Sequence, residues 1–262
     1  MSTVRVALIQ SDIFFGDPEA NYAAFAEKMK QAVAQKAEFI ILPEMWTTAY
    51  DLKRIQEIGD REGERTKEFL QTFARENNVT IIGGSVAQIK DGKVYNTTFA
   101  VDNKGEIVAE YSKIHLFRIM REDKYLTGGE ELASFPYGNT KVGITICYDI
   151  RFPELARSYA LDGAGILVNS AEWPHPRLNH WRTLMQARAI ENQMYVVACN
   201  RVGISGKTEF CGHSMVIDPW GEILVEGGEE EAILIAEIDL TLIEEVRGKI
   251  PVFADRRPDL YK

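Results

Sequence analysis

The feature that most constrains the fold is an alternation of short β-branched runs with longer amphipathic segments. Residues 4–10, 39–42 and 80–85 are short apolar runs of the kind that form strands. Residues 21–34 place apolar side chains at helical spacing, and residues 64–77 are predicted as a second helix. A chain with this alternation must cover its strands with helices, which predicts an α/β fold.

The second half of the chain repeats the alternation, and both halves contain predicted hairpins. A turn at residues 102–105 joins two predicted strands, and strands joined this closely are antiparallel. We therefore predict two facing sheets with helices outside them, and a single doubly wound sheet is the alternative. The remaining predicted strands are 94–101, 107–112, 141–146, 166–169, 195–200, 212–217 and 232–239, and the remaining predicted helices are 152–161, 180–192 and 240–249.

No linker or change in composition divides the 262 residues. Hydrophobic residues make up 45% and charged residues 26%, as in ordinary globular domains. We therefore predict one domain over residues 1–262, with a C-terminal tail from about residue 251, because no periodicity continues beyond that point.

The overall charge argues against two classes of partner. The net charge is −9 and the pI is about 5.1, which disfavours a nucleic acid or an anionic membrane surface. No signal peptide is recognised, and no apolar run approaches the roughly 20 residues of a membrane helix. Three cysteines are too few and too odd in number for a disulfide framework, so we expect a cytoplasmic protein.

Several familiar site motifs do not occur in the sequence. Residues 212–216 fail the serine-hydrolase elbow at its last position, and residues 163–165 lack the third glycine of a dinucleotide site. There is no P-loop and no zinc-ligand spacing, so we expect neither a metal nor an organic cofactor. Asn96 begins a glycosylation sequon, which we interpret as an accident of strand composition.

Three predicted strands end in a reactive side chain: a carboxylate at Glu44, an amine at Lys113 and a thiol at Cys147. Strand ends in α/β proteins lie where ligands bind, so these groups can share one pocket. Glu44 is a candidate base for the thiol proton, and Lys113 is a candidate oxyanion donor, worth about 3–4 kcal/mol. A helix predicted soon after Cys147 would favour its thiolate. Taken singly, each residue also has an ordinary structural explanation: a core thiol, a turn carboxylate and a solvated amine.

The same segments resemble the nitrilase superfamily of carbon–nitrogen hydrolases. The matches are Leu42-Pro-Glu44-Met-Trp46, Tyr111-Ser-Lys113-Ile-His-Leu-Phe117 and Ile144-Thr-Ile-Cys147-Tyr-Asp-Ile-Arg151-Phe-Pro-Glu154, in the family's order and with similar spacing. The resemblance runs from residue 4 to residue 253 and implies a four-layer αββα sandwich.

The resemblance also implies a role for each matched residue. Glu44 would be the general base, Lys113 the oxyanion stabiliser and Cys147 the nucleophile. Glu122 precedes a Tyr-x-x-Gly-like segment and would position Lys113 and the amide nitrogen, while the backbone N–H of Tyr148 would complete the oxyanion hole. Family members commonly form dimers and larger assemblies. We therefore expect a homo-oligomer, at least a dimer, in which the partner covers the apolar side chains of the tail: Val252, Phe253, Leu260 and Tyr261.

The Tyr-Asp that follows Cys147 resembles the amidase branches, because nitrilases proper usually have Trp-Glu there. Further similarity is to omega-amidases, which implies ammonia release from a small omega-amido 2-oxo acid such as 2-oxoglutaramate. The loop over residues 170–176 departs from the animal omega-amidase pattern. Trp173 in this loop would wall the pocket or simply cover the core. The candidates to face a substrate carboxylate are Arg151, Arg118, His175 and Arg177.

Other functions are compatible with parts of this pattern. An N-carbamoyl amine or amino-acid hydrolase would use the same triad, and a nitrile hydrolase is a more distant alternative. A non-catalytic scaffold would have no need for Glu44, Lys113 and Cys147 together. A redox-sensing protein would use Cys199 or Cys211 to resolve Cys147.

Overall fold

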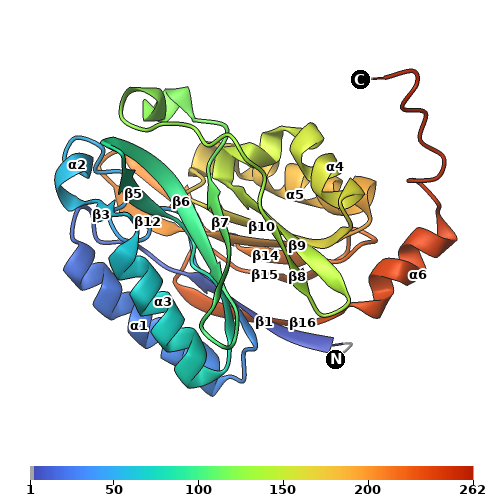
Figure 1. Ribbon diagram of the computed structural model, residues 1–262, viewed down its shortest axis with the longest axis horizontal. Coiled ribbons are helices and arrows are strands. Elements are labelled where there is room, and N and C mark those ends of the chain that lie inside the picture. The colour runs from blue at the N-terminus through green and yellow to red at the C-terminus, as the bar shows by residue number, and fades with distance from the viewer. Residues whose placement is uncertain (1–2, 262) are drawn as a thin grey trace.

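The computed structural model describes residues 3–261 and contains two large mixed sheets (Figure 1). The first has eight strands: β1 (Thr3–Gln10), β2 (Phe39–Ile41), β3 (Asp60–Arg61), β4 (Thr80–Ile82), β5 (Val86–Lys90), β6 (Lys93–Val101), β7 (Ile107–Ser112) and β16 (Ala232–Asp239). Their order is β16-β1-β2-β4-β6-β5-β3, with β7 paired to β6.

The second sheet has six strands: β8 (Ser134–Tyr137), β9 (Thr140–Ile146), β10 (Ala164–Ala171), β11 (Tyr195–Asn200), β14 (Met215–Ile217) and β15 (Ile223–Glu226). Their order is β15-β14-β11-β10-β9-β8, and the neighbours β9, β10 and β11 are parallel. A separate antiparallel hairpin consists of β12 (Val202–Ser205) and β13 (Thr208–Cys211).

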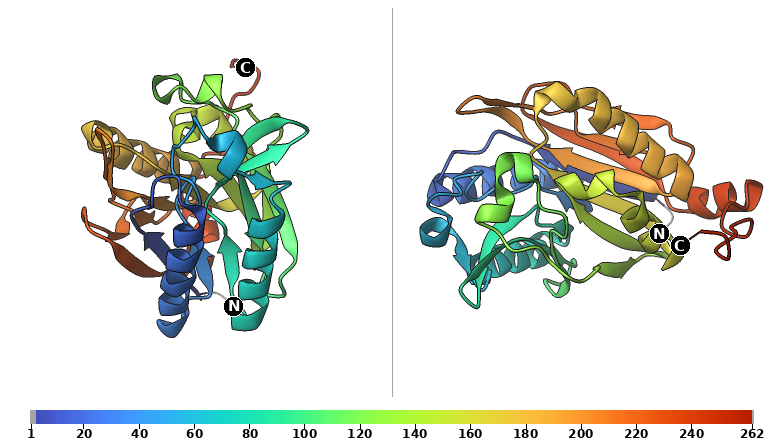
Figure 2. Two further views of the ribbon diagram at one scale, coloured as in Figure 1. Left: turned by 90° about the vertical axis from the view of Figure 1, so that its left-hand side faces the viewer. Right: turned by 90° about the horizontal axis from the view of Figure 1, so that it is seen from above.

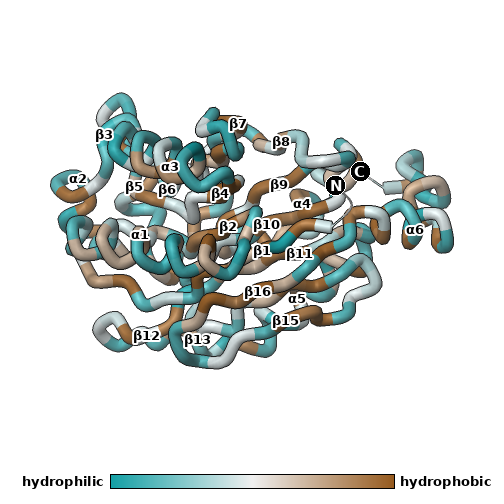
Figure 3. Tube along the Cα trace, turned by 90° about the horizontal axis from the view of Figure 1, so that it is seen from below, coloured by the Kyte–Doolittle hydropathy of each residue, from teal (hydrophilic) through white to brown (hydrophobic). Residues whose placement is uncertain are grey.

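The two sheets pack against each other and helices cover their outer faces (Figure 2). Val6, Leu8 and Ile41 of the first sheet share one core with Ile144 and Val168 of the second. Helices α1 (Pro18–Ala34) and α3 (Glu64–Asn77) pack on the first sheet, and α4 (Pro153–Leu161) and α5 (Leu178–Asn192) pack on the second. Figure 3 shows the hydrophobic stretches concentrated in the strands. The predicted αββα layering is confirmed.

Most predicted elements occur at or near their predicted bounds. The helix over residues 64–77 is confirmed at both ends, whereas α1 begins earlier than predicted, because Asp17 accepts a hydrogen bond from the Ala20 N–H and Pro18 starts the first turn. The elements that the sequence did not predict are short: β3, β5, β8, β12, β13, β15, α2 (Ile55–Ile58) and the 3-10 turns Arg118–Met120, Glu122–Lys124, Cys147–Arg151 and His175–Arg177.

The predicted strand over residues 80–85 is wrong in its second half. The strand β4 ends at Ile82, and Gly84 adopts a φ of +62°. A Cβ atom at Gly84 would lie 2.1 Å from the carbonyl oxygen of Pro43, so only glycine lets the chain pass this close to the turn before Glu44. The break in the strand therefore makes room for one of the candidate site residues.

The C-terminal segment leaves the body of the molecule after α6 (Thr241–Lys249) (Figure 1). Residues 251–261 contain no helix or strand. Phe253 packs partly against the core, whereas the exposed fractions of Leu260 and Tyr261 are 71% and 51%. None of the helices within residues 3–261 is long and apolar enough to cross a membrane.

Candidate active site

Three strand ends bring the candidate residues together at the seam between the two sheets. Glu44 and Lys113 follow β2 and β7 of the first sheet, and Cys147 follows β9 of the second. The side chains of Glu44 and Lys113 are fully buried, and Cys147 is 6% exposed. The explanation of Lys113 as a solvated lysine is therefore wrong, because its ammonium lies in the protein interior.

The Lys113 ammonium lies between two carboxylates. Its Nζ donates hydrogen bonds of 2.8 Å to Glu44 Oε1 and of 2.8 Å to Glu122 Oε1. Burial opposes the charged form, but the two carboxylates outweigh it and raise the pKa of Lys113 well above its ordinary value. The amine is consequently held as an ammonium with a fixed direction, which is the state needed to stabilise an oxyanion.

The Glu44 carboxylate receives hydrogen bonds on both of its oxygens. Oε1 accepts from Lys113, from Tyr50 Oη at 2.7 Å and from Asn96 Nδ2 at 2.8 Å, while Oε2 accepts from the Glu172 N–H at 2.8 Å. Burial alone would raise the pKa of Glu44, but Lys113 and these hydrogen bonds lower it below its ordinary value. Glu44 is thus ionised and ready to accept a proton.

The Tyr50 hydroxyl links Glu44 to Glu122. It lies 2.7 Å from Glu44 Oε1 and 2.6 Å from Glu122 Oε1, yet it has one proton to donate. Burial and the negative charge of Glu44 raise the pKa of Glu122, although Lys113 opposes the shift. A proton on Glu122 would satisfy the second contact of the hydroxyl. Glu122 also accepts the Phe117 N–H at 2.8 Å, so it anchors the loop after Lys113.

Cys147 adopts an unusual backbone conformation. Its φ is +46°, in the left-handed region that costs a non-glycine residue about 1–2 kcal/mol. The residue begins a 3-10 turn, Cys147–Arg151, and the α-helix starts only at Pro153. The helix predicted over residues 152–161 is α4, but its first turn does not lie at the thiol. The sharp turn instead ends the strand at the thiol, as expected for strain concentrated at a functional site.

The resting state of the thiol also differs from the prediction. Burial and the negative charge of Glu44 raise the pKa of Cys147 well above its ordinary value, and Lys113 only partly offsets them. The expectation that a helix start would favour the thiolate is wrong because desolvation and a neighbouring carboxylate dominate. The thiol keeps its proton until a base removes it, and Glu44 is the ionised base beside it.

Asp149 fixes the turn that presents Cys147. Its buried carboxylate accepts hydrogen bonds from the Ile146 N–H at 3.0 Å, from the His115 N–H at 3.0 Å and from the Tyr111 hydroxyl at 2.6 Å. Because His115 and Tyr111 flank Lys113 in sequence, one carboxylate ties the cysteine turn of the second sheet to the lysine segment of the first.

A small cavity lies over Cys147. It is lined by Phe117, Cys147, Tyr148, Arg151, Glu172, Trp173, Pro174 and Arg177. Trp173 is 2% exposed and lines this cavity, and the Arg151 guanidinium lies 4.6 Å from the centre of its ring. Arg151 Nη2 lies 3.3 Å from His180 Nδ1.

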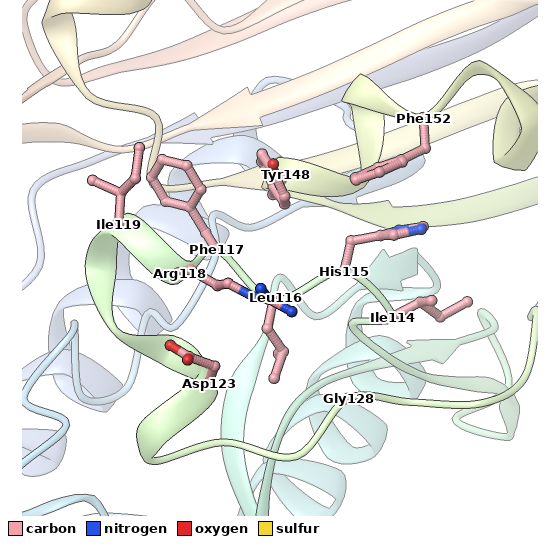
Figure 4. A pocket seen from close by; sticks show the side chains of 10 residues that line it. All are labelled: Ile114, His115, Leu116, Phe117, Arg118, Ile119, Asp123, Gly128, Tyr148 and Phe152. Atoms are coloured by element: carbon pink, nitrogen blue, oxygen red, sulfur yellow. The ribbon is translucent and has the colours of Figure 1, made fainter.

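Two predicted basic candidates lie elsewhere. His175 Nε2 lies 3.0 Å from Glu229 Oε1 and does not line the cavity. Arg118 lines a neighbouring groove, which shares only Phe117 and Tyr148 with the cavity over Cys147 (Figure 4). Arg151 and Arg177 are therefore the candidates that the structure places beside the thiol.

Four residues of the site were not predicted from the sequence as site residues: Tyr50, Asn96, Glu172 and Arg201. Asn96 was noted only as a sequon, but it is fully buried and donates to Glu44. Asn96 lies in β6, which pairs with β7, the strand that precedes Lys113. This pairing is what could have indicated that Asn96 belongs to the site. Tyr50, Glu172 and Arg201 lie in irregular segments or at strand ends, where no periodicity marks a side chain as buried.

The remaining cysteines and potential metal ligands are placed as follows. Cys199 and Cys211 are free and buried, and burial raises the pKa of Cys211 to about 12. Residues 3–261 contain no group of three or more His, Cys, Asp or Glu side chains arranged to hold a metal ion.

Comparisons with known proteins identify the class to which this site belongs. The family model for carbon–nitrogen hydrolases matches residues 5–248. The chain is 47% identical to the 2-oxoglutaramate amidase of Bacillus subtilis over 98% of each chain, and 37% identical to omega-amidase NIT2 of Homo sapiens over 100% of this chain and 98% of the other. The structure of Saccharomyces cerevisiae Nit3, a nitrilase-superfamily member, matches with a TM-score of 0.91 at 30% identity, covering 98% of this chain and 97% of the other.

The chain belongs to the carbon–nitrogen hydrolase family. The family predicted from the sequence is therefore confirmed, together with its nitrilase-type fold. The similarity to omega-amidases extends over the full length of the chain.

Proposed function

We propose that this protein is an amidase that hydrolyses the terminal carboxamide of a small omega-amido 2-oxo acid, with 2-oxoglutaramate as the leading substrate. The observation that carries the proposal is the buried cluster of Glu44, Lys113 and Glu122 beside the Cys147 thiol. The substrate is suggested by the similarity to the 2-oxoglutaramate amidase and to omega-amidase NIT2.

The first half of the proposed reaction is acylation of Cys147. Glu44 takes the thiol proton as Sγ bonds to the amide carbon, and the electron pair of the carbonyl moves to its oxygen. Lys113 Nζ and the Tyr148 N–H stabilise that oxyanion. When the intermediate collapses, the C–N bond breaks, Glu44 returns its proton to the nitrogen, and ammonia leaves behind a thioester.

The second half is hydrolysis of the thioester. Glu44 is again a carboxylate and takes a proton from water as the water oxygen bonds to the acyl carbon. The C–S bond then breaks, the acid leaves, and the proton returns to Sγ. The lowered pKa of Glu44 and the raised pKa of Cys147 keep the resting proton on the thiol, so its transfer to Glu44 accompanies the bonding of Sγ to the amide carbon. No step requires a metal or an organic cofactor.

The Cys147→Ala variant tests this proposal. It removes only the nucleophilic sulfur, so ammonia release from 2-oxoglutaramate is expected to vanish while the melting temperature changes little. Wild-type protein stopped by acid during turnover should carry an acyl adduct on Cys147, detected by mass spectrometry. Cys199→Ala is the matched control, because that thiol is buried and contacts the Ile9 carbonyl oxygen at 3.4 Å. Activity in Cys147→Ala, or an adduct on Cys199 or Cys211, would contradict the proposal.

Ammonia release from other substrates separates the proposed activity from the related hydrolase activities. Release of carbon dioxide together with ammonia from N-carbamoyl amines would indicate the N-carbamoyl hydrolase instead. Conversion of a simple nitrile but of no carboxamide would indicate a nitrile hydrolase.

The proposal also covers the oligomeric state and the cellular location of the protein. We propose one domain that forms a homo-oligomer, because Val252 and Phe253 precede a tail that exposes Leu260 and Tyr261. A light-scattering mass equal to one chain would contradict the oligomer. We place the protein in the cytoplasm, where reducing conditions keep the Cys147 thiol free. Detection of the endogenous protein outside the cytoplasmic fraction would contradict this location.

A further inference from the structure

Glu172 is an acidic residue that faces the site without belonging to the triad. It follows β10, its side chain is fully buried, and its backbone N–H donates to Glu44 Oε2 at 2.8 Å. It also lines the cavity over Cys147. A buried carboxyl group in a substrate cavity needs an explanation, because burial of an unpaired charge is costly.

The two oxygens of the Glu172 side chain have different surroundings. Oε2 accepts a hydrogen bond of 2.7 Å from Arg201 Nη1. Oε1 is buried and has no hydrogen-bond partner within residues 3–261. A buried polar atom without a partner is rare in folded proteins, and one on a residue that lines the cavity over Cys147 can be satisfied by a ligand bound there.

Arg201 does not require an ionised Glu172 for charge balance. Its Nη2 also donates to Asp12 Oδ1 at 2.9 Å, so Asp12 already compensates the guanidinium. Burial raises the pKa of Glu172 to about 8, and the negative charge of Glu44 adds to this shift against the opposing effect of Arg201. At neutral pH Glu172 is therefore mainly a carboxylic acid. Because Oε2 faces the Arg201 donor, the proton belongs on Oε1.

We infer that Glu172 is a specificity residue that donates a hydrogen bond from Oε1 to the 2-oxo oxygen of the substrate. This inference rests on the proposed function. Arg151 and Arg177 line the same cavity and supply positive charge for the neighbouring carboxylate of the substrate. A neutral donor suits the uncharged oxo group beside that carboxylate, whereas an ionised Glu172 would repel it.

The inference predicts a change in substrate binding on the alkaline side. As pH rises through about 8, Glu172 loses its proton, the donor disappears and the KM for a 2-oxo acid amide increases. Glu122 also has a raised pKa but contacts Lys113 and Tyr50, so it must be distinguished by mutation. The titratable and charged groups around Glu172 are Arg201, Asp12, Glu44, Tyr50, Cys147, Arg151 and Arg177.

The test compares 2-oxoglutaramate with glutaramate, which has a methylene group in place of the oxo group. Ammonia release is measured from about pH 6 to about pH 9 for the wild type, Glu172→Gln and Glu172→Leu. Glutamine places its oxygen toward Arg201 and its NH2 group at the position of Oε1, so Glu172→Gln should keep the 2-oxo preference but lose the alkaline rise in KM. Glu172→Leu should lose the preference by about 10-fold to 100-fold in kcat/KM.

Glu229→Gln is the matched control, because this exposed acid pairs with His175 outside the cavity. It should keep both the preference and the alkaline rise. Thermal unfolding establishes that each variant is folded. If Glu172→Leu does not fold, the comparison of KM between the wild type and Glu172→Gln across pH still tests the inference.

Three results would overturn the inference. These are an undiminished 2-oxo preference in folded Glu172→Leu, an alkaline rise in KM that persists in Glu172→Gln, and a wild type that does not distinguish the two amides. The last result would leave an active amidase and so spare the proposed reaction. A wild type that releases ammonia from neither amide would instead refute the proposed function, and the inference with it.

Discussion

Lys113 and Arg201 each lie between two carboxyl groups, and their clusters meet at Glu44. Lys113 contacts Glu44 Oε1, whereas the Arg201 cluster reaches Glu44 Oε2 through the backbone of Glu172. The side chains of the lysine cluster are fully buried. In the arginine cluster the Asp12 side chain is 48% exposed, so water shares in neutralising its charge.

This difference in exposure to water determines which carboxyl group can hold a proton. In the lysine cluster the charges must balance within the protein, which fixes the ammonium and the Glu44 carboxylate in position. In the arginine cluster the solvated Asp12 balances Arg201, which leaves Glu172 free to be a neutral acid. Two clusters, each of one basic and two acidic side chains, thus suit two tasks: a rigid acid–base pair and an uncharged donor to a ligand.

The largest effect is expected for Lys113→Met. It leaves two buried carboxyl groups without their cation, and such a loss typically destabilises a protein by about 3–5 kcal/mol. Loss of the oxyanion donor should also reduce kcat/KM by about 100-fold to 1000-fold. Urea unfolding and ammonia release measure the two effects.

The pH dependence of this loss has a defined sign. The folded-state pKa of Glu44 is lowered, so its ionised form contributes stability above its ordinary pKa of 4.5, and that contribution disappears as pH falls through the folded value. The destabilisation of Lys113→Met should therefore shrink in acid. Lys113→Arg is the control that keeps the charge. An unfolding free energy for Lys113→Met equal to that of the wild type would mean that the cluster is not ionised.

A smaller effect is expected for Arg201→Met. Asp12 can turn to water and Glu172 is already neutral, so the cost should be about 1–3 kcal/mol, mainly from the lost hydrogen bonds. Urea unfolding at neutral pH gives the comparison with Lys113→Met, and Arg201→Lys is the matched control. Equal destabilisation by the two methionine variants would show that Glu172 is ionised, and the contrast between the clusters would fail.

The layers and most of the longer elements could be predicted from the sequence. The runs in β1, β9 and β10 are buried on both faces and are therefore continuously apolar, whereas long helices such as α3 carry one apolar face and show helical periodicity. The strand ends at Glu44, Lys113 and Cys147 were visible for the same reason. Short edge strands such as β3 and β15 leave no such pattern, because few of their side chains are buried.

The rest of the site could not be predicted because tertiary contacts decide it. Met45, Ala49, Arg121 and Cys147 all have positive φ next to site residues, although none is a glycine. Such conformations are imposed by surrounding packing and leave no local signal in the sequence. The raised pKa of Cys147 likewise depends on Glu44, which lies in the other sheet.

Because the site lies between the two sheets, its activity depends on how the sheets are positioned relative to each other. Glu44 and Lys113 are carried by one sheet and Cys147 by the other, with Asp149 bonded across the boundary to Tyr111. A substitution in the core between the sheets can shift one sheet relative to the other. Such a shift would separate Glu44 from Cys147 even if both sheets stayed folded. Catalysis therefore reports on the alignment of two halves of the chain, neither of which holds the complete set of reacting groups.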